Sequence, residues 1–395
     1  MKVLFLTTLL PSHKLHGSEV ASQNIVEALQ QAGCMVTVVG YGRKEDGALN
    51  RAAHEVLVAD RAVETKKAKL QAMRWFVLSL IKRLPYSGAK YLSSRYLKQV
   101  RSLLSAQSYD VIVIDHAQLG WLRDVVDHPR MILIAHNLEH ELYRQHFERS
   151  RNPIAKWVYH REATTVKALE AKTAASVAEV WALTQHDANY FAQFTKARAL
   201  SLPSGFICRQ TESTEKRFDV GIIGSWAWKP NVEGLQWFLD KVYPHLPQSI
   251  TIHVAGRGAD WLTGRYPNLV YQGFVDDPQV FMRQARVMAI PTLSGGGIQI
   301  KTLDSIASGS RIVATAIALR GIATPPRTVS IADQPEHFAQ QLIAATTTEP
   351  SPEAAQDAQQ WYYNRQALFL NEVKQAISEL TSSVGAGWIR HADRR

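Results

Sequence analysis

Short apolar runs alternate along this chain with stretches whose apolar residues recur at helical spacing. In the N-terminal half, residues 3–8 form the first run, a helical pattern covers 21–32, Gly33 ends it, and residues 35–39 form the next run. Runs of this length are typical of buried strands, and a strand–helix–strand order is typical of a parallel sheet. The same pattern predicts strands at 111–114, 131–135 and 180–184.

The alternation restarts after an irregular stretch. Leu202-Pro203-Ser204-Gly205 and the polar run 210–217 are typical of a linker. Beyond it, strands are predicted at 218–224, 250–255, 269–271, 287–290 and 311–315. We therefore predict an α/β protein with two Rossmann-like domains, residues 1–205 and 206–355. A helix over 356–384 is expected to pack back toward the N-terminal domain, and residues 385–395 are expected to be a frayed tail.

One stretch of the second domain carries the most distinctive chemistry. Three glycines at 295–297 follow a predicted strand, and a helix is expected to begin near Ile298. Such a loop exposes backbone N–H groups beside the positive end of a helix dipole, which favours phosphate. Lys301 and Asp304 share one helix face, so a cation for a diphosphate lies beside a carboxylate for sugar hydroxyls. The stretch indicates a nucleotide-sugar site, and the alternative is a glycine-rich turn before an ordinary amphipathic helix.

Two other loops of this domain pair glycine with a cation. Gly224 and Ser225 open a loop that reaches Lys229, and Arg257 stands between two glycines. Both loops follow predicted strands, and the carboxyl ends of parallel strands are where such sheets bind ligands. We expect these loops to converge with the 295–304 loop at one edge of one sheet.

Polar residues also follow two strands of the first domain. Asp115 and His116 follow one strand, and His136 and Asn137 follow the next. Asn137 is expected to cap the helix that starts after it. His136 either faces a ligand at the strand end or is a satisfied structural residue.

The first helix begins with Gly17-Ser18, which is similar to an anion site. The three-glycine spacing of a dinucleotide fold is missing, and no acid follows the second strand for a ribose. This pattern argues against a dehydrogenase.

Composition and charge narrow the class of partner. The 395-residue chain has a formal net charge of +10 and a pI of about 9.5, which predicts an anionic partner: nucleic acid, lipid head groups or a phosphorylated substrate.

Cys34 and Cys208 form neither a disulfide framework nor a metal cluster, and they fit a reducing, cytoplasmic location. Residues 1–10 are similar to a short signal peptide, but no small-residue cleavage site follows and Pro11 interrupts them, so a buried strand is expected. The apolar run 75–81 is too short to span a bilayer.

Between residues 61 and 101, basic residues far outnumber Glu64, the one acid, and aromatic and aliphatic residues are interleaved with them. This pattern predicts a basic amphipathic helix or helical pair on anionic lipid, peripheral at the inner membrane face, with Trp and Tyr at head-group depth. The alternative is a solvated helix whose apolar side packs on its own domain.

Taken together, these residues resemble the glycosyltransferase group 1 family, whose members have two facing Rossmann-like domains with parallel sheets and a cleft between them, the GT-B fold. The resemblance is carried by residues 17–19, 135–140, 202–205, 224–231, 273–277 and 295–309. It implies a retaining, family 4-like transfer of a hexosyl group from a nucleotide diphosphate sugar. A polysaccharide or lipid-linked acceptor, in cell-surface or exopolysaccharide biosynthesis, is expected.

The resemblance also implies roles for individual residues. His136 would contact the donor sugar at the reacting carbon, Lys229 and Lys301 would neutralise the diphosphate, and Asp304 would hold the ribose hydroxyls. The other donor-side residues would be Gly17, Ser18, Gly224, Ser225, Arg257, Phe274, Gly296, Gly297 and Ile298. The acceptor or membrane surface would comprise Asn137, Arg74, Trp75, Lys82 and Arg83.

One departure from the family pattern leaves the donor sugar open. Members commonly carry an acid eight residues before the ribose-binding one, and Gly296 stands at that place. No Asp-x-Asp pair occurs in the sequence. We therefore expect no metal and no other cofactor, with amides and cations stabilising the leaving diphosphate. The resemblance implies a front-face attack.

Two other functions fit parts of this pattern. A sugar-nucleotide epimerase or hydrolase would use the same fold, and a non-catalytic basic protein would bind membrane or nucleic acid. Because the cations of 61–101 are separate in sequence from the glycine-rich strand ends, we expect a surface patch and a separate pocket. The transferase interpretation expects no bound nucleic acid.

Overall fold

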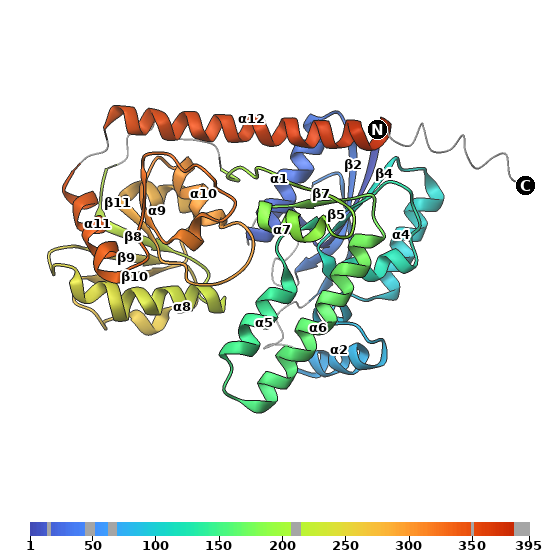
Figure 1. The fold of residues 1–395 in the computed structure, drawn as a ribbon, viewed down its shortest axis with the longest axis horizontal. Helices are drawn as coiled ribbons and strands as arrows, with labels where there is room; N and C mark the ends of the chain where they lie inside the picture. The colour runs from blue at the N-terminus through green and yellow to red at the C-terminus, as the bar shows by residue number, and fades with distance from the viewer. Residues whose placement is uncertain (14–16, 44–51, 62–68, 207–214, 349–350, 383–395) are drawn as a thin grey trace, which may run out of the picture. The chain divides into compact units, whose positions relative to one another are not determined.

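The computed structural model describes residues 1–13, 17–43, 52–61, 69–206, 215–348 and 351–382 (Figure 1). These residues form two compact units. The N-terminal unit comprises Met1–Ser201 together with the chain from Leu368 onward, and the C-terminal unit comprises Leu202–Ala367. The boundary therefore lies a few residues before the predicted one at 205. Residues 210–214 of the predicted linker, Cys208 and the predicted tail fall outside the described residues.

The described strands of the N-terminal unit lie in one parallel sheet of order β3-β2-β1-β4-β5-β6-β7. Their bounds are β1 Lys2–Leu9, β2 Met35–Arg43, β3 Glu55–Arg61, β4 Val111–Asp115, β5 Met131–Ala135, β6 Glu179–Ala182 and β7 Lys196–Ala199. Strands β1, β4 and β5 are buried nearly throughout, as strands covered on both faces must be. The prediction of a buried first strand is confirmed.

The helices of this unit are η1 Pro11–His13, α1 Gly17–Gln31, α2 Lys69–Ile81, α3 Tyr86–Ala89, α4 Ser94–Ala106, η4 Ala117–Asp124, α5 Glu139–Arg149, α6 Pro153–Ala175 and α7 Gln185–Phe191. Gly33, at φ 84°, follows α1 and ends it as predicted. Helices α5 and α6 lie side by side (Figure 1). Leu138 is the N-cap of α5 and makes no side-chain cap bond, so the capping role predicted for Asn137 is wrong.

The C-terminal unit has a second parallel sheet, of order β10-β9-β8-β11-β12-β13 among the described strands. Its strands are β8 Phe218–Ile223, β9 Ile252–Ala255, β10 Leu269–Gly273, β11 Ala285–Ile290, β12 Arg311–Ala314 and β13 Val329–Ile331. Its helical segments are α8 Lys229–Trp237, η5 Phe238–Val242, η6 Tyr243–His245, η7 Asp260–Leu262, α9 Pro278–Gln284, α10 Ile300–Ala307, η8 Ala316–Leu319 and α11 Pro335–Thr347. Helix α10 begins two residues after its predicted start, and Gly309, at φ 75°, ends it as predicted.

The long helix α12, Pro352–Ser382, contributes to both units. In its C-terminal part, Glu379 accepts hydrogen bonds from Lys196 (2.6 Å) and Arg198 (2.8 Å) beside β7. In its earlier part, Tyr362 donates to the carbonyl of Phe206 (2.8 Å). Polar bonds therefore fix each part of α12 to its own unit.

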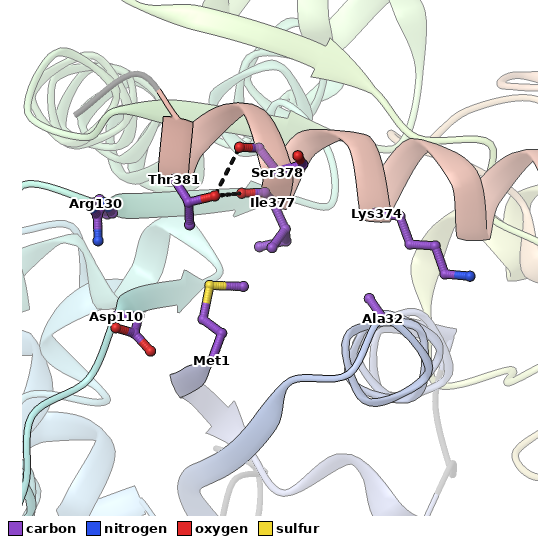
Figure 2. A pocket seen from close by; sticks show the side chains of 8 residues that line it. All are labelled: Met1, Ala32, Asp110, Arg130, Lys374, Ile377, Ser378 and Thr381. Carbon is purple, nitrogen blue, oxygen red and sulfur yellow. Dashed lines mark hydrogen bonds between the residues drawn. The ribbon is translucent and has the colours of Figure 1, made fainter. Parts of the chain in front are cut away.

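A hollow of about 530 Å³ lies in the N-terminal unit beneath α12 (Figure 2). It is lined by Met1, Ala32, Asp110, Arg130, Lys374, Ile377, Ser378 and Thr381. Met1, Asp110 and Arg130 precede β1, β4 and β5, so the hollow lies at the amino edge of the sheet. His136 follows β5 at the opposite edge, and none of the predicted site residues lines this hollow. Among the described helices, none is long and apolar enough to cross a membrane.

Candidate active site

Backbone hydrogen bonds join the loops that leave β8, β9 and β10. The N–H of Trp226 donates to the carbonyl of Arg257 (3.0 Å), and the N–H of Gly256 donates to that of Gly273 (2.6 Å). Gly256 has φ 110°, and a Cβ there would lie 1.7 Å from the carbonyl oxygen of Gly224, so only glycine fits. The part of the prediction that brings the loops after β8 and β9 together is confirmed.

Arg257 and Phe274 form an exposed pair on these loops. The guanidinium lies over the ring, 4.2 Å from its centroid, and Phe274 is 54% exposed. Ser225, in the neighbouring loop, is also exposed. The pair offers a flat face and a positive charge to a planar or anionic ligand group.

Lys229 opens α8, and the start of this helix is tied to the glycine-rich loop. Its exposed ammonium lies 3.7 Å from Glu233. Glu233 in turn accepts a hydrogen bond from Ser294 (2.9 Å), which directly precedes the glycines at 295–297. Sequence reasoning missed Glu233, because one acid on a helix gives no local signal of a long-range bond.

The glycine-rich loop and Lys301 lie together. Gly295 and Gly297 have φ of 108° and 66°, which glycine adopts readily, and Gly296 and Ile298 are half-buried. The ammonium of Lys301 donates to the side-chain carbonyl of Asn231 (3.0 Å) in the first turn of α8. Burial lowers the pKa of Lys301 to about 8, so it stays mostly charged at neutral pH.

Asp304 is only 7% exposed and accepts a hydrogen bond from the hydroxyl of Ser204 (2.7 Å). Burial raises its pKa to about 7, although the bonds from Ser204 and the N–H of Gly205 oppose that shift. Lys301 and Asp304 have the expected spacing on α10, but their side chains bond to different segments, Lys301 to Asn231 in α8 and Asp304 to Ser204.

Arg320 is a cation at the glycine-rich loop that sequence reasoning missed. It follows η8 and donates to the carbonyl of Gly295. A Cβ on Gly295 would lie 3.7 Å from its guanidinium. The contact spans 25 residues of sequence, and nothing in the pattern around Arg320 indicates it.

In the N-terminal unit, Asp115 holds His136 in place. The carboxylate accepts hydrogen bonds from Thr7 and Ser22 (both 2.7 Å) on one oxygen and lies 2.7 Å from His136 Nε2 through the other. Burial alone would raise the pKa of Asp115, but His116 and His136 hold it well below its usual range. An ionised carboxylate therefore fixes the ring of His136 and the proton on Nε2.

His116 stacks on His136, with ring centroids 3.9 Å apart and planes at 14°. Its φ of 78° is strained for a residue with a side chain. Burial, reinforced by His136, lowers its pKa to about 4, so this ring is neutral. Asp115, His116 and His136 offer ligand atoms within 4.8 Å of one another. A cation there would have to displace the hydrogen bond between Asp115 and His136.

Gly17 and Ser18 begin α1 close to this cluster. Both are exposed, and the carbonyl of Ser18 accepts a bond from Ser22 (2.9 Å), which also bonds Asp115. The predicted Gly17, Ser18 and His136 thus lie at one strand edge. Asn137 follows His136, and its side-chain oxygen is buried without a hydrogen-bond partner among the described residues.

Glu139 belongs to the same edge, and sequence reasoning gave it no role. It accepts a bond from Gln118 (3.3 Å), and its N–H donates to the buried Glu170 (2.7 Å). Burial, with Glu170 adding to it, raises the pKa of Glu139 to about 8.

The segment 61–101 differs from its prediction. Trp75 is only 4% exposed, so it does not lie at a membrane surface, and its ring meets Tyr86 edge-on. Tyr91 is buried as well. Arg61 is the last residue of β3 rather than part of a helix. Trp75 points into the unit. Both faces of α2 carry apolar residues, so the spacing of these residues alone does not predict which face the unit covers.

Arg74, Lys82 and Arg83 are exposed on or just after α2, as predicted. Lys66 and Lys67 lie outside the described residues.

Comparison with solved structures shows which fold these two sheets have. The fold is that of GT-B glycosyltransferases. HepE from Anabaena, solved with UDP, is 15% identical, with a TM-score of 0.61 over 97% of this chain and 100% of that one. A UDP-forming α,α-trehalose-phosphate synthase from Burkholderia xenovorans is 11% identical, with a TM-score of 0.62 over 96% and 99%. Starch synthase IV from Arabidopsis thaliana is 11% identical, with a TM-score of 0.58 over 97% and 98%.

A family model matches one part of the chain. Residues 217–347 match the family described as glycosyl transferases group 1. The matched segment lies within the C-terminal unit, so this unit is similar to the group 1 glycosyltransferases. No curated protein sequence matches the chain.

Proposed function

We propose that this enzyme is a retaining glycosyltransferase that moves a sugar from a nucleotide diphosphate sugar to a polysaccharide or lipid-linked acceptor without a metal ion. The observation that carries the proposal is the joining of glycine-rich loops, Lys229, Arg257 and Lys301 at one edge of the C-terminal sheet. Backbone amides and cations that need not reorganise are what a leaving diphosphate requires. The UDP and UDP-glucose held by HepE structures support a nucleotide-sugar donor.

In this reaction the C-terminal unit holds the donor. Lys229, Lys301 and the glycine-loop amides neutralise the diphosphate, and Phe274 with Arg257 stacks on the base. A ribose hydroxyl bonds Asp304, whose carboxyl already accepts a bond from Ser204. Ionisation of Asp304 on nucleotide binding strengthens that contact, since charged acceptors form the stronger hydrogen bonds.

His136 acts on the donor sugar as the bond to phosphate breaks. The anomeric C–O bond breaks with its electrons staying on the phosphate oxygen, the acceptor hydroxyl attacks from the same face, and its proton passes to that phosphate. Asp115 fixes the imidazole ring through Nε2. Because the carboxylate of Asp115 already serves Thr7, Ser22 and His136, we assign this cluster to positioning rather than to a metal.

Release of nucleoside diphosphate from a panel of nucleotide sugars, with and without a membrane extract as acceptor source, tests this function. Acceptor-dependent release with the sugar incorporated supports it, and His136→Ala should abolish the release. Asp304→Ala should weaken the binding of the nucleoside diphosphate. Asp240→Ala, on an exposed acid of the C-terminal unit, is its control and should leave that binding unchanged. Steady release without any acceptor would favour a hydrolase, and isomerised donor would favour an epimerase. The absence of nucleoside diphosphate binding would overturn the proposal.

We also propose that α2 docks on an anionic membrane surface at the inner face. Its exposed apolar side chains form one stripe at helical spacing: Leu70, Met73, Val77, Leu80 and Ile81. Leu70 is 87% exposed and Ile81 71%, and the buried Trp75 faces the other way. Arg74, Lys82 and Arg83 flank the stripe with charge that suits acidic lipid.

Co-sedimentation with phosphatidylglycerol vesicles tests this docking. Leu80→Asp should release the protein from vesicles, and added salt should weaken its binding. Ile154→Asp, on an exposed apolar residue of α6, is the matched control and should leave binding intact. Equal vesicle binding by wild type and Leu80→Asp would contradict a docking role for α2.

A further inference from the structure

Ser204 lies in the segment with which the C-terminal unit begins, and its hydroxyl is bonded on two sides. The N–H of Phe206 donates to the hydroxyl oxygen (3.0 Å), and the hydroxyl donates to Asp304 Oδ1 (2.7 Å). Ser204 is 8% exposed and Asp304 is 7% exposed, so water competes little for this bond. Because the hydroxyl has a single proton and the Phe206 N–H occupies a lone pair, that proton is directed at the carboxyl.

The long helix α12 fixes the segment around Ser204. Tyr362 donates to the carbonyl of Phe206 (2.8 Å), and Nε of Arg365 donates to the carbonyl of Leu202 (2.8 Å). Leu202 is fully buried. The backbone is therefore bonded to α12 on both sides of Ser204, and it presents the hydroxyl to α10 at a fixed position.

Asp304 has no ionic partner among the described residues. The charged side chains on its own helix and on the elements near it are Lys301 on α10, Asp277 and Arg283 on α9, Arg311 on β12 and Arg365 on α12, and none of these described groups pairs with it. Lys301 bonds Asn231 instead. Burial raises the pKa of Asp304 to about 7, and only the bonds from Ser204 and the N–H of Gly205 oppose that shift. Ser204 thus supplies the one side-chain bond that favours the ionised carboxylate.

We propose that Ser204 is a positioning residue for donor binding, whose hydroxyl directs the carboxylate of Asp304 toward a ribose hydroxyl of the nucleotide. The inference rests on the proposed transferase function and adds a residue to its donor site. A bond to a carboxylate is stronger than a bond to a neutral acid, so Ser204 favours the form of Asp304 that a ribose hydroxyl needs as its acceptor. Ser204 thereby keeps donor binding effective near neutral pH although the carboxylate is buried.

The pH dependence of nucleoside diphosphate binding tests this role. Isothermal titration of the full-length protein with UDP, ADP, GDP and CDP is carried out from about pH 6 to pH 9. The affinity of the tightest ligand should rise as Asp304 ionises and fall as Lys301 loses its proton. Ser204→Ala should move the rising limb to higher pH by about one unit, because a bond to a charged group is lost. Titration of the diphosphate itself is common to all variants.

Matched variants separate this role from a merely structural one. Ser249→Ala, on an exposed serine of the same unit, should leave the binding profile unchanged. Asp304→Asn should lack the limb that Asp304 causes, and adding Ser204→Ala to Asp304→Asn should move nothing further.

A second measurement needs no nucleotide. The folded state of wild type holds the extra proton of Asp304, so the urea midpoint should fall with rising pH until about pH 7. In Ser204→Ala the fall should continue to about pH 8, because the pKa of Asp304 is raised further when the bond is lost.

The outcomes distinguish this inference from the function on which it rests. An unchanged binding profile in Ser204→Ala, or a shift as large in the Asp304→Asn background, overturns the inference and leaves the transferase function standing. The same fall of the urea midpoint in wild type and Ser204→Ala also overturns it. Wild type that binds none of the four diphosphates at any pH overturns the transferase function and the inference together.

Discussion

The carboxyl edges of the two sheets are built in different ways. In the C-terminal unit, glycines and backbone bonds shape the edge, and the cations Lys229 and Arg257 are exposed. In the N-terminal unit, buried side chains shape it, with Asp115 bonded to three neighbours. The C-terminal edge is therefore suited to grip a variable anionic ligand, while the N-terminal edge is suited to hold one imidazole in one orientation.

The difference makes the N-terminal edge the more fragile one. Asp115→Ala removes the acceptor of Thr7, Ser22 and His136 at a fully buried position, which should cost about 3–5 kcal/mol of unfolding free energy. Urea denaturation measures this cost. Asp127→Ala, on an exposed acid of the same unit, should change the midpoint little. Nucleoside diphosphate affinity of the folded Asp115→Ala protein should match wild type, and a loss of that affinity would mean that the two edges are not independent in donor binding.

At the C-terminal edge, backbone geometry should matter most. Gly256→Ala must fit a side chain against the carbonyl of Gly224 at φ 110°, so it should cost more than the roughly 1–2 kcal/mol of left-handed strain alone and weaken nucleoside diphosphate binding. Gly264→Ala is the matched control, because Gly264 has φ 72° with nothing within 4 Å of its Cβ position. Equal melting temperatures for the two variants would show that the close approach at Gly256 is not needed.

A smaller effect should appear in the pH dependence of stability. The pKa of Asp304 is about 7 in the folded protein against 3.8 ordinarily, so the folded state holds the extra proton and stability should fall as pH rises from about 4 to 7. The pKa of Lys301 is about 8 in the folded protein against 10.5 ordinarily, so the folded state binds fewer protons. Lys301 should therefore raise stability as pH rises from about 8 to 10.5. In Asp304→Asn the loss of unfolding free energy between about pH 4 and 7 should be smaller by about 1 kcal/mol or more. Denaturation midpoints across pH check this, and identical slopes would contradict a buried protonated Asp304.

The sequence was informative where structure is local. The buried strands β1, β4, β5 and β11 are short apolar runs, and Gly33 and Gly309 mark helix ends, so these could be predicted. The edge strands β3, β7 and β13 were missed because half-exposed strands mix polar and apolar residues.

Long-range contacts explain the errors in the candidate site. Ser204 bonds Asp304 across 100 residues, and the inward position of Trp75 depends on which face of α2 meets the unit. Local spacing records neither. The strand-end loops could be predicted to converge because parallel strands share one carboxyl edge whatever their side chains are.

The most direct test of the donor site is a thermal-shift panel of nucleoside diphosphates on wild type, His136→Ala and Lys301→Ala. A ligand that binds only the folded state raises the melting temperature. We predict that at least one nucleoside diphosphate raises the melting temperature of wild type and of His136→Ala. It should raise that of Lys301→Ala much less, because the residues that bind the diphosphate lie at the C-terminal edge. A panel without any shift, or a shift as large in Lys301→Ala as in wild type, would contradict the account.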